Sequence, residues 1–392
     1  MTESPISRRP PRIFISVAEQ SADEHAAGLI RAFKLLHGDA HFYGLAGAAM
    51  RAEGCGCFHD MTAKSAMASA ALLRIPEGLQ LLHRIKQHFS EQRYDAAVVV
   101  DSPALNLPIA KSCHARGIPV LYYIAPQTWA WGPRAWRNRR LQKRVDRVAC
   151  IWPFEEAHFR QDGISATYVG HPSFDRLGSL TVDEKRIAQL RENASPVLTL
   201  LPGSRDHVIE EVLPGQLEVA RSVLSAHRRA RILIVAASEK AGERIKSLLS
   251  ESRPTIKCDI MRGDLDRAAA IRAADLVLTA SGTVTLEVMY HGTPMIVMYN
   301  TARWSYQLVA RWLINTPFLS IPNILAGREI VPEYMPYYRT TDPIVARVRE
   351  WLATPSTLER VRRDLRETIA PIAKSGAAAN AAKELDNLLK RW

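Results

Sequence analysis

Strand-like apolar runs alternate with segments of helical periodicity along almost the whole of this 392-residue chain. This alternation is typical of parallel sheets whose two faces are covered by helices. The sequence therefore predicts an α/β fold. Expected strands in the first half are 12–17, 41–45, 96–100, 120–124, 148–151 and 167–169. Expected strands in the second half are 197–201, 231–236, 257–261, 276–278 and 295–298.

The length of the chain exceeds what one ordinary hydrophobic core supports, so two domains are expected. A polar stretch follows Asp175 and places the boundary near residues 176–195. The predicted domains are 1–176 and 177–365, followed by a helical tail at 366–392. Because the two halves share one plan, we expect two similar sheets that face a cleft.

The composition restricts the possible partners. With 52 basic and 40 acidic side chains the net charge is +12, which favours phosphates, polyanions or an anionic lipid surface without choosing between them. Five cysteines without a paired CxxC spacing argue against a zinc site or a disulfide framework, and favour a reducing compartment. We expect neither a signal peptide nor a spanning helix, so that any membrane contact would be peripheral.

One candidate anion site is the turn Ser281-Gly282-Thr283, which lies between an apolar run and a new helical segment. Free N–H groups and the positive end of the helix dipole favour an anion at such a junction. Glu287, one turn into the helix, could accept hydrogen bonds from sugar hydroxyls. The alternative is that Ser281 caps the helix and Glu287 is only a first-turn acid.

A second turn of the same kind, Pro202-Gly203-Ser204-Arg205, ends the first strand of the second half. Gly203 would let the backbone approach an anion, and Arg205 could bind a diphosphate or stabilise a departing one. A simple Pro-Gly turn followed by a solvated arginine is the alternative. The two turns are expected to converge above one sheet edge.

Several motifs in order resemble those of lipid-A-disaccharide synthases, and the similarity runs from about Arg12 to the C-terminus. These motifs are APQTWAW at 125–131, WPFE at 152–155, VGHP at 169–172, PGSR at 202–205, ASGT at 280–283 with LE at 286–287, and PNILAGRE at 322–329.

The resemblance implies a GT-B type fold with two Rossmann-like, doubly wound domains. It also implies a metal-independent, inverting glycosyltransferase that needs no cofactor, since the UDP-sugar is a substrate. The family joins an acylated glucosamine from UDP to an acylated glucosamine 1-phosphate at the inner face of the cytoplasmic membrane. It also allows a homodimer and a C-terminal tail that packs on an N-terminal domain, its own or a partner's. The nucleotide site would comprise Gly203, Ser204, Arg205, Ser281, Gly282, Thr283, Glu287 and Asn323.

The N-terminal half departs from the family pattern where the chemistry is expected. In the loop 18–26, AEQSADEHA, three positions that are usually glycine are alanine, while Glu19, Ser21 and Asp23 are retained. In DSPALN at 101–106, Ala104 stands where the family typically has a second aspartate.

An inverting transfer benefits from a base that removes the acceptor hydroxyl's proton. Since Ala104 cannot do so, Asp101, Asp23, Glu19 and His25 are the candidates, and Arg205 would assist the leaving group. Glu19, Ser21 and Asn106 are expected to contact substrate. Asp101 could instead be a turn acid and His25 a solvated histidine. Two other functions stay open: a UDP-sugar transferase with another donor or acceptor, and a non-catalytic nucleotide-sugar or lipid sensor.

Other segments permit two interpretations each. Trp129, Trp131, Trp136 and seven basic residues at 134–147 resemble a nucleic-acid surface, but a solvated basic helix face is favoured and no nucleic-acid partner is expected. The amphipathic segments 66–89 and 304–314 could lie on a bilayer or pack in the core. The segment 55–59, CGCFH, is expected to be a turn rather than a metal site.

Overall fold

The computed structural model describes residues 9–60, 75–130, 132–252, 256–300 and 316–391. The predicted amphipathic segment 304–314, residues 66–74 of the other one, and Trp131 lie outside these ranges. The chain forms two compact units. The first contains the residues up to Asp175 together with those from Lys374 onward, and the second is Arg176–Ala373.

The first unit is built on a seven-stranded parallel sheet with the order β3-β2-β1-β4-β5-β6-β7. Its strands are β1 (Arg12–Ser16), β2 (His41–Leu45), β3 (Gly56–His59), β4 (Ala96–Val100), β5 (Val120–Tyr123), β6 (Arg147–Cys150) and β7 (Ala166–Tyr168). The second unit has a six-stranded sheet with the order β10-β9-β8-β11-β12-β13, also parallel. Its strands are β8 (Val197–Leu201), β9 (Arg231–Ala236), β10 (Asp259–Arg262), β11 (Leu276–Thr279), β12 (Met295–Met298) and β13 (Glu333–Tyr334).

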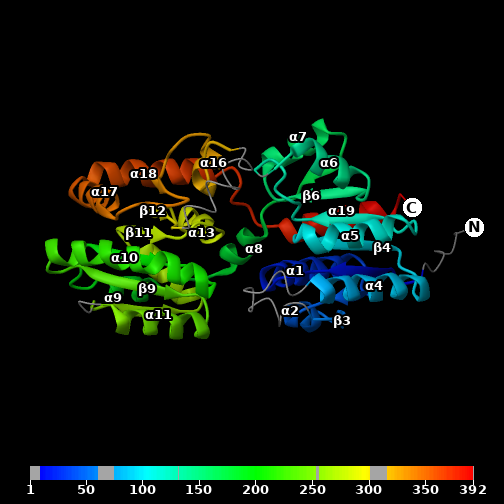
Figure 1. Cartoon of the computed structure of the whole chain (residues 1–392), viewed down its shortest axis with the longest axis horizontal. Coiled ribbons are helices and arrows are strands. Elements are labelled where there is room, and N and C mark those ends of the chain that lie inside the picture. Colours follow the sequence, from blue (N-terminus) through cyan, green and yellow to red (C-terminus); the bar gives the residue numbers. More distant parts are fainter. Residues whose placement is uncertain (1–8, 61–74, 131, 253–255, 301–315, 392) are drawn as a thin grey trace, which may run out of the picture. The chain divides into compact units, whose positions relative to one another are not determined.

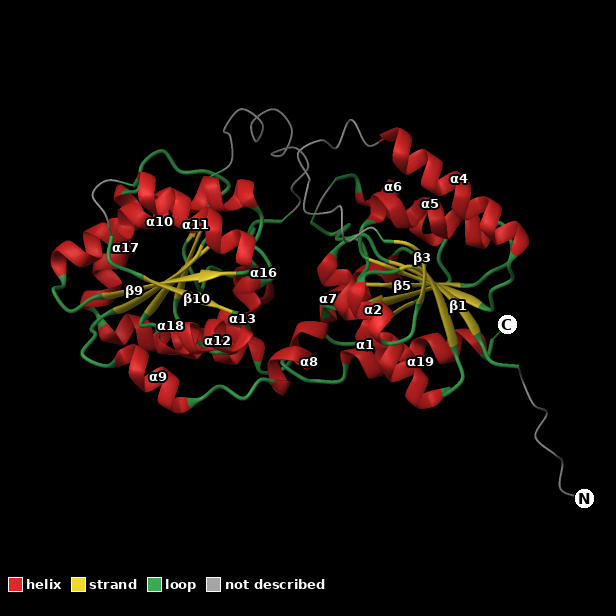
Figure 2. Cartoon of the chain, turned by 90° about the horizontal axis from the view of Figure 1, so that it is seen from below, coloured by secondary structure: helices red, strands yellow, loops and turns green. Residues whose placement is uncertain are grey.

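Helices cover both faces of each sheet (Figures 1 and 2). In the first unit α4 and α5 lie on one face and α1 and α19 on the other; in the second, α10 and α11 lie opposite α9, α12 and α18. The first unit contains α1 (Gln20–Leu36), α2 (Ala48–Ala52), α4 (Ile75–Glu91), α5 (Pro103–His114), α6 (Arg134–Gln142), α7 (Pro153–Gln161) and α19 (Ala377–Leu389), and α8 (Pro172–Ser179) spans the boundary. The second contains α9 (Glu184–Arg191), α10 (Asp206–Ala226), α11 (Glu239–Glu251), α12 (Asp264–Ala273), α13 (Val284–Tyr290), α16 (Ile321–Ala326), α17 (Asp342–Ala353) and α18 (Pro355–Ile369).

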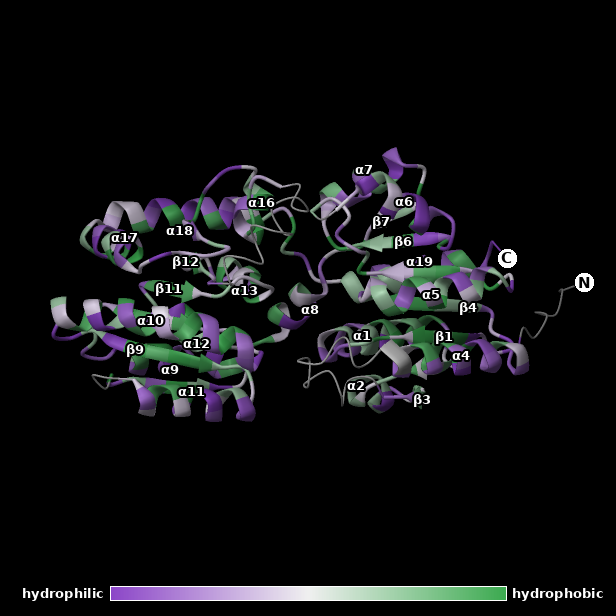
Figure 3. Ribbon diagram, in the orientation of Figure 1, coloured by the Kyte–Doolittle hydropathy of each residue, from purple (hydrophilic) through white to green (hydrophobic). Residues whose placement is uncertain are grey.

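Burial on both faces explains the continuous apolar runs seen in the sequence. All five residues of β4 and of β8 are buried, which is typical of parallel strands between two helical layers. The central strands are accordingly hydrophobic in Figure 3, as β1 and β9 show. The predicted fold class, two doubly wound α/β sheets, is confirmed. Among the described helices, none combines the length and apolarity that crossing a bilayer requires.

Two edge strands were not predicted. Residues 55–59 do not form the expected turn: Gly56–His59 is the edge strand β3, which pairs with β2. β13 has only two residues and pairs with β12. Short edge strands need no long apolar run, because they are only partly covered, and the hydrophobic pattern therefore misses them.

The C-terminal helix returns to the first unit. α19 contacts α1 and β4, β5 and β6. The C-terminal tail was expected to begin at residue 366, but the chain rejoins the first unit only at Lys374. The reason is that α18 continues to Ile369 and packs on α13, α16 and α17 in the second unit. Asp175 fixes the start of α19: Oδ1 accepts the N–H groups of Gly376 (2.5 Å) and Ala377 (3.1 Å), and Oδ2 accepts that of Ala378 (2.9 Å).

We predict that Asp175→Ala lowers the free energy of unfolding of the first unit by about 1–2 kcal/mol, because three helical N–H groups lose a charged acceptor. The measurement is a urea titration, with amide hydrogen exchange to locate the loss in α19. The matched control is Asp183→Ala, which removes a cap that accepts one N–H, from Lys185 at 2.9 Å. Equal losses in the two variants would contradict the role given to Asp175.

Candidate active site

The two phosphate-type turns of the second unit lie next to each other. β8 and β11 are neighbouring strands, with Leu201 opposite Thr279, so the turns that follow them leave the same sheet edge. The strand order reverses here, since β9 lies on the other side of β8 and β12 on the other side of β11. Ligands of doubly wound sheets bind at such switch points. The predicted convergence of the two turns is confirmed.

Glycine is required in the first of these turns. Gly203 has φ +112°, and a Cβ atom there would lie 2.7 Å from Cγ1 of Val208. Ser204 and Arg205 are exposed, as are Gly282 and Thr283 in the other turn, and Ser281 is half-buried. Arg205 is the N-cap residue of the 21-residue helix α10. Its guanidinium cannot accept a hydrogen bond, so the N-cap side chain does not compete with an anion for the first-turn N–H groups.

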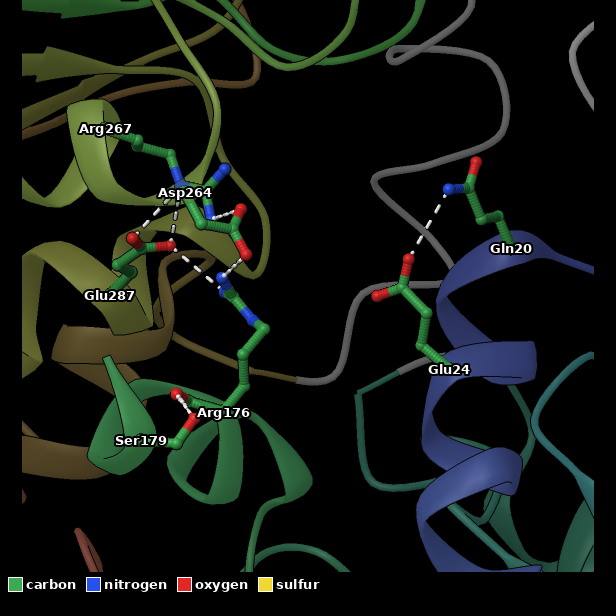
Figure 4. Close-up of polar contacts among 7 residues, drawn as sticks. All are labelled: Gln20, Glu24, Arg176, Ser179, Asp264, Arg267 and Glu287. Carbon is green, nitrogen blue, oxygen red and sulfur yellow. Dashed lines mark hydrogen bonds and ion pairs between the residues drawn. The ribbon is translucent and has the colours of Figure 1, made fainter. Parts of the chain in front are cut away.

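Glu287 lies in a cluster of four charged side chains within the second unit (Figure 4). Its carboxylate is 3% exposed. Nε of Arg267 donates to both of its oxygens at 3.0 Å, and Nη2 of Arg176 donates to Oε2 at 3.2 Å. Asp264 pairs with both arginines, at 2.7 Å from Arg267 and 3.1 Å from Arg176. Burial lowers the pKa of Arg267, but the attraction of Glu287 and Asp264 outweighs burial, and the net pKa is raised.

This cluster changes the role expected of Glu287. Its oxygens are already held by arginines, so any sugar hydroxyl would share them with Arg176 and Arg267. The sequence analysis missed both arginines and Asp264. Only the pair Asp264 and Arg267, three residues apart in the first turn of α12, carries a local signal.

Asn323 does not present its amide to a cleft. It is 0% exposed. Its Nδ2 donates to the carbonyl of Val331 (2.8 Å) and to Glu333 (2.7 Å), and its Oδ1 accepts the N–H groups of Ile330 (2.8 Å) and Val331 (3.0 Å). The amide is therefore fully used to fix the segment that leads into β13.

Asp101 lies at the corresponding switch point of the first sheet. β1 and β4 are neighbours, with β2 and β5 on their outer sides, and Asp101 directly follows β4. Asp101 and Ser102 have φ values of +51° and +43°, a left-handed conformation that costs about 1–3 kcal/mol per non-glycine residue. Such strain persists where surrounding contacts enforce it, and it is concentrated at functional sites.

Two side chains enforce this backbone. The carbonyl of Asp101 accepts Nδ2 of Asn106 at 2.7 Å and the hydroxyl of Tyr122 at 2.7 Å. Nδ2 of Asn106 also donates to Val100 (2.8 Å), and its Oδ1 accepts the hydroxyl of Ser16 (2.7 Å). Asn106 is 0% exposed, so it positions Asp101 instead of contacting substrate as expected. Tyr122 was missed because a tyrosine inside a strand carries no signal of this contact.

The environment of Asp101 suits a proton acceptor. Burial raises the pKa of its carboxyl, a backbone hydrogen bond from Ser102 opposes this, and the neighbouring charge of Glu19 raises it further. Glu19, half-buried, is the N-cap residue of α1 and follows β1, so these two carboxylates share one sheet edge. A carboxylate whose pKa is raised is a stronger base than an ordinary aspartate.

Asp23 has a structural role that the sequence did not indicate. It is 2% exposed. Its oxygens accept the N–H groups of Gly47 (2.8 Å), Ala49 (2.8 Å) and Met50 (3.3 Å) at the start of α2. All three bonds hold the carboxylate as a helix cap, so it is poorly placed to accept a proton from a substrate.

His25 and Ser21 lie on α1, where Ser21 is exposed and His25 is half-buried. His25 lies within electrostatic reach of His171. Burial and, to a smaller extent, His25 lower the pKa of His171 to about 3, and Nδ1 of His171 accepts the N–H of Ser173 at 3.2 Å. His171 is therefore neutral, and its proton is on Nε2.

Sequence comparison identifies the family. A family model described as lipid-A-disaccharide synthetase matches residues 13–381. A lipid-A-disaccharide synthase of Myxococcus xanthus is 34% identical over 384 residues, covering 97% of this chain and 98% of the relative. One of Alcanivorax borkumensis is 32% identical over 382 residues, with the same coverage of 97% and 98%.

Solved structures agree in fold at low sequence identity. The Staphylococcus aureus MnaA–UDP co-structure has a TM-score of 0.64 at 11% identity, covering 97% of this chain and 96% of that one. A putative UDP-N-acetylglucosamine 2-epimerase of Listeria monocytogenes has a TM-score of 0.61 at 12% identity, with coverages of 96% and 95%. The fold is that of GT-B glycosyltransferases and related epimerases. Because the family model spans nearly the whole chain and full-length relatives exceed 30% identity, this chain belongs to the lipid-A-disaccharide synthase family, the hexosyltransferases of lipid A biosynthesis.

Proposed function

We propose that this chain transfers an acylated glucosamine from UDP to an acylated glucosamine 1-phosphate, with inversion at the anomeric carbon. The observation that carries this proposal is Asp101, a carboxylate of raised pKa held in a strained conformation at the switch point of the first sheet. Family membership supports the donor and the acceptor, since the relatives named above are lipid-A-disaccharide synthases.

In this mechanism Asp101 accepts the proton of the acceptor hydroxyl. The hydroxyl oxygen attacks the anomeric carbon as the bond from that carbon to the UDP oxygen breaks, so the configuration inverts. Asn106 and Tyr122 hold the Asp101 backbone and thereby keep its carboxylate in place. Glu19 contributes a like charge that makes Asp101 the stronger base.

The leaving UDP is stabilised by the second unit. The first turn of α10, the exposed backbone at Gly282 and Thr283 and the Arg205 side chain would supply N–H donors and positive charge to the diphosphate. Because these groups provide the charge that a metal often supplies, we propose a reaction without metal or cofactor. Turnover should be unchanged in the presence of EDTA.

We further propose a peripheral position at the inner face of the cytoplasmic membrane, since both substrates are acylated and the chain carries a net charge of +12.

We also propose that two copies of the chain form a homodimer. Exchange of α19 between two copies would preserve its contacts with α1 and its cap at Asp175.

The direct test is an assay of the purified chain with acylated UDP-glucosamine and acylated glucosamine 1-phosphate. We expect stoichiometric UDP and lipid disaccharide. UDP binding by calorimetry without turnover on any donor would instead identify a non-catalytic homologue, and turnover with another sugar would change the substrate.

We predict that Asp101→Asn lowers kcat by about 10²–10⁴-fold, because the amide cannot accept the proton. In the wild type, kcat should fall at low pH with an apparent pKa above that of an ordinary aspartate. Glu19→Gln should shift this acidic limb of the profile to lower pH, since removing a neighbouring negative charge lowers the pKa of Asp101.

His25→Ala distinguishes His25 from Asp101 as the base. If Asp101 is the base, His25→Ala keeps the acidic limb at its wild-type pH. If the acidic limb disappears in His25→Ala while Asp101→Asn stays active, His25 is the base and Asp101 is not.

We predict that Arg205→Ala lowers kcat by about 10²–10³-fold, the range found when one transition-state donor is removed. UDP affinity measured by calorimetry should fall as well. Arg228→Ala is the matched control, because Arg228 is an exposed arginine just beyond the other end of α10. Full activity of Arg205→Ala would exclude this residue from leaving-group stabilisation.

A further inference from the structure

A pocket of about 220 Å³ lies in the first unit between the start of α5, the segment after β5, and α6. Pro103 and Ala104, which line it, follow directly after Asp101 and Ser102. Part of the pocket wall is therefore within three residues of the proposed base along the chain. Nothing in the nucleotide site or in the proton transfer described above uses it.

One wall of the pocket is suited to hydrocarbon. It includes Leu107, Leu141 and three prolines, among them Pro108 and Pro126. Because proline has no N–H group, this wall offers few backbone donors to a polar ligand. A hydrocarbon chain bound there would displace few hydrogen bonds of the wall and would be removed from water.

Cations also line the pocket. Arg137 and Arg140 line the pocket from α6, three residues apart and hence on one helix face. The guanidinium of Arg140 lies over the ring of Trp136, 4.4 Å from its centroid, and this contact restricts its motion. Burial lowers the pKa of Arg137, and burial and then Arg140 lower the pKa of Arg144. The shift at Arg137 indicates a partly desolvated cation in the pocket, which a bound dianion would stabilise.

The walls are fixed before any ligand binds. Thr128, on the segment after β5, shares a hydrogen bond of 2.9 Å with Nε2 of His158. Nε1 of Trp129 donates to Glu155 at 2.9 Å. α6 is attached to α7 by Asn138, whose Nδ2 donates to Asp162 at 2.6 Å. A preformed site loses less entropy on binding than one that must be ordered.

We propose that this pocket is a subsite for the acyl-sugar phosphate acceptor, with the end of an acyl chain against Leu107 and Leu141 and the phosphate on Arg137 and Arg140. The proposal rests on the proposed function and gives the acceptor a place beside Asp101. Pockets that enclose whole ligands have about 300–1,000 Å³, so this smaller volume fits a segment of one chain only. The sugar would lie outside the pocket, toward Asp101.

The test is calorimetric binding of n-octyl phosphate to the full-length chain, below its micellar concentration. We expect binding that weakens up to about fourfold for each methylene removed. Inorganic phosphate and octyl glucoside, which each match only one side of the pocket, should bind at least about tenfold more weakly.

Two pairs of variants locate the ligand. Leu107→Trp fills the apolar side and should abolish octyl phosphate binding and raise KM for the acceptor at least about tenfold, with KM for the UDP-sugar unchanged. Leu35→Trp, at a leucine of α1 that is 85% exposed, is its control. Arg140→Gln should reduce octyl phosphate binding to that of octyl glucoside, and its control is the exposed neighbour Arg139→Gln. Ala104→Phe, at an exposed position at the pocket, replaces Leu107→Trp if that variant does not fold.

Equal binding of octyl phosphate to the wild type and to the filled variant would overturn the proposal, as would equal effects of Arg140→Gln and Arg139→Gln. If Leu107→Trp loses binding to phosphatidylglycerol vesicles but keeps octyl phosphate, the pocket is a membrane contact and the proposal fails. If the chain shows no transferase activity but binds octyl phosphate in this pattern, the proposed reaction is wrong and the pocket assignment stands.

Discussion

Burial of both faces of each parallel sheet decides where the chemistry of this chain can lie. The central strands are fully covered by helices, so polar groups along them have no access to ligand. The carboxyl edges stay open, and neighbouring loops diverge there only where the strand order reverses. Asp101 follows β4 at this point of the first sheet, and the turn at Gly203 follows β8 at the same point of the second. The same constraint that builds the cores therefore selects both candidate sites.

At each edge, buried polar side chains hold the exposed ones in position. Asn106 and Asn323 are both 0% exposed, and a buried amide without partners would cost about 1–3 kcal/mol for each unsatisfied group. Both amides satisfy their hydrogen bonds within the protein, and in doing so they fix the Asp101 backbone and the approach to β13. The buried carboxylate of Glu287 is stabilised by charge instead: Arg267 and Arg176 both pair with it, so that its negative charge is compensated inside the protein.

Local pattern explains which parts of this architecture could be predicted from the sequence. Long apolar runs such as β4 and β8 could be predicted, and so could the glycine turns, because their signals lie within a few residues. The edge strands β3 and β13 are too short and too exposed for such a signal. Partnerships over long separations could not be predicted at all: Arg176 and Glu287 are 111 residues apart, and neither has a neighbour in sequence that indicates the other.

The alanine at position 104 connects the proposed base with the pocket. The family typically has a second carboxylate here, and Asp101 already shares its edge with Glu19, whose charge raises its pKa. A third negative charge on the first turn of α5 would raise this pKa further and would oppose a phosphate on Arg137 and Arg140. Ala104 instead adds an exposed methyl group beside the apolar wall. With alanine here, the proposed mechanism assigns proton transfer to Asp101, and the surface beside it favours the acylated anion that we propose for the pocket.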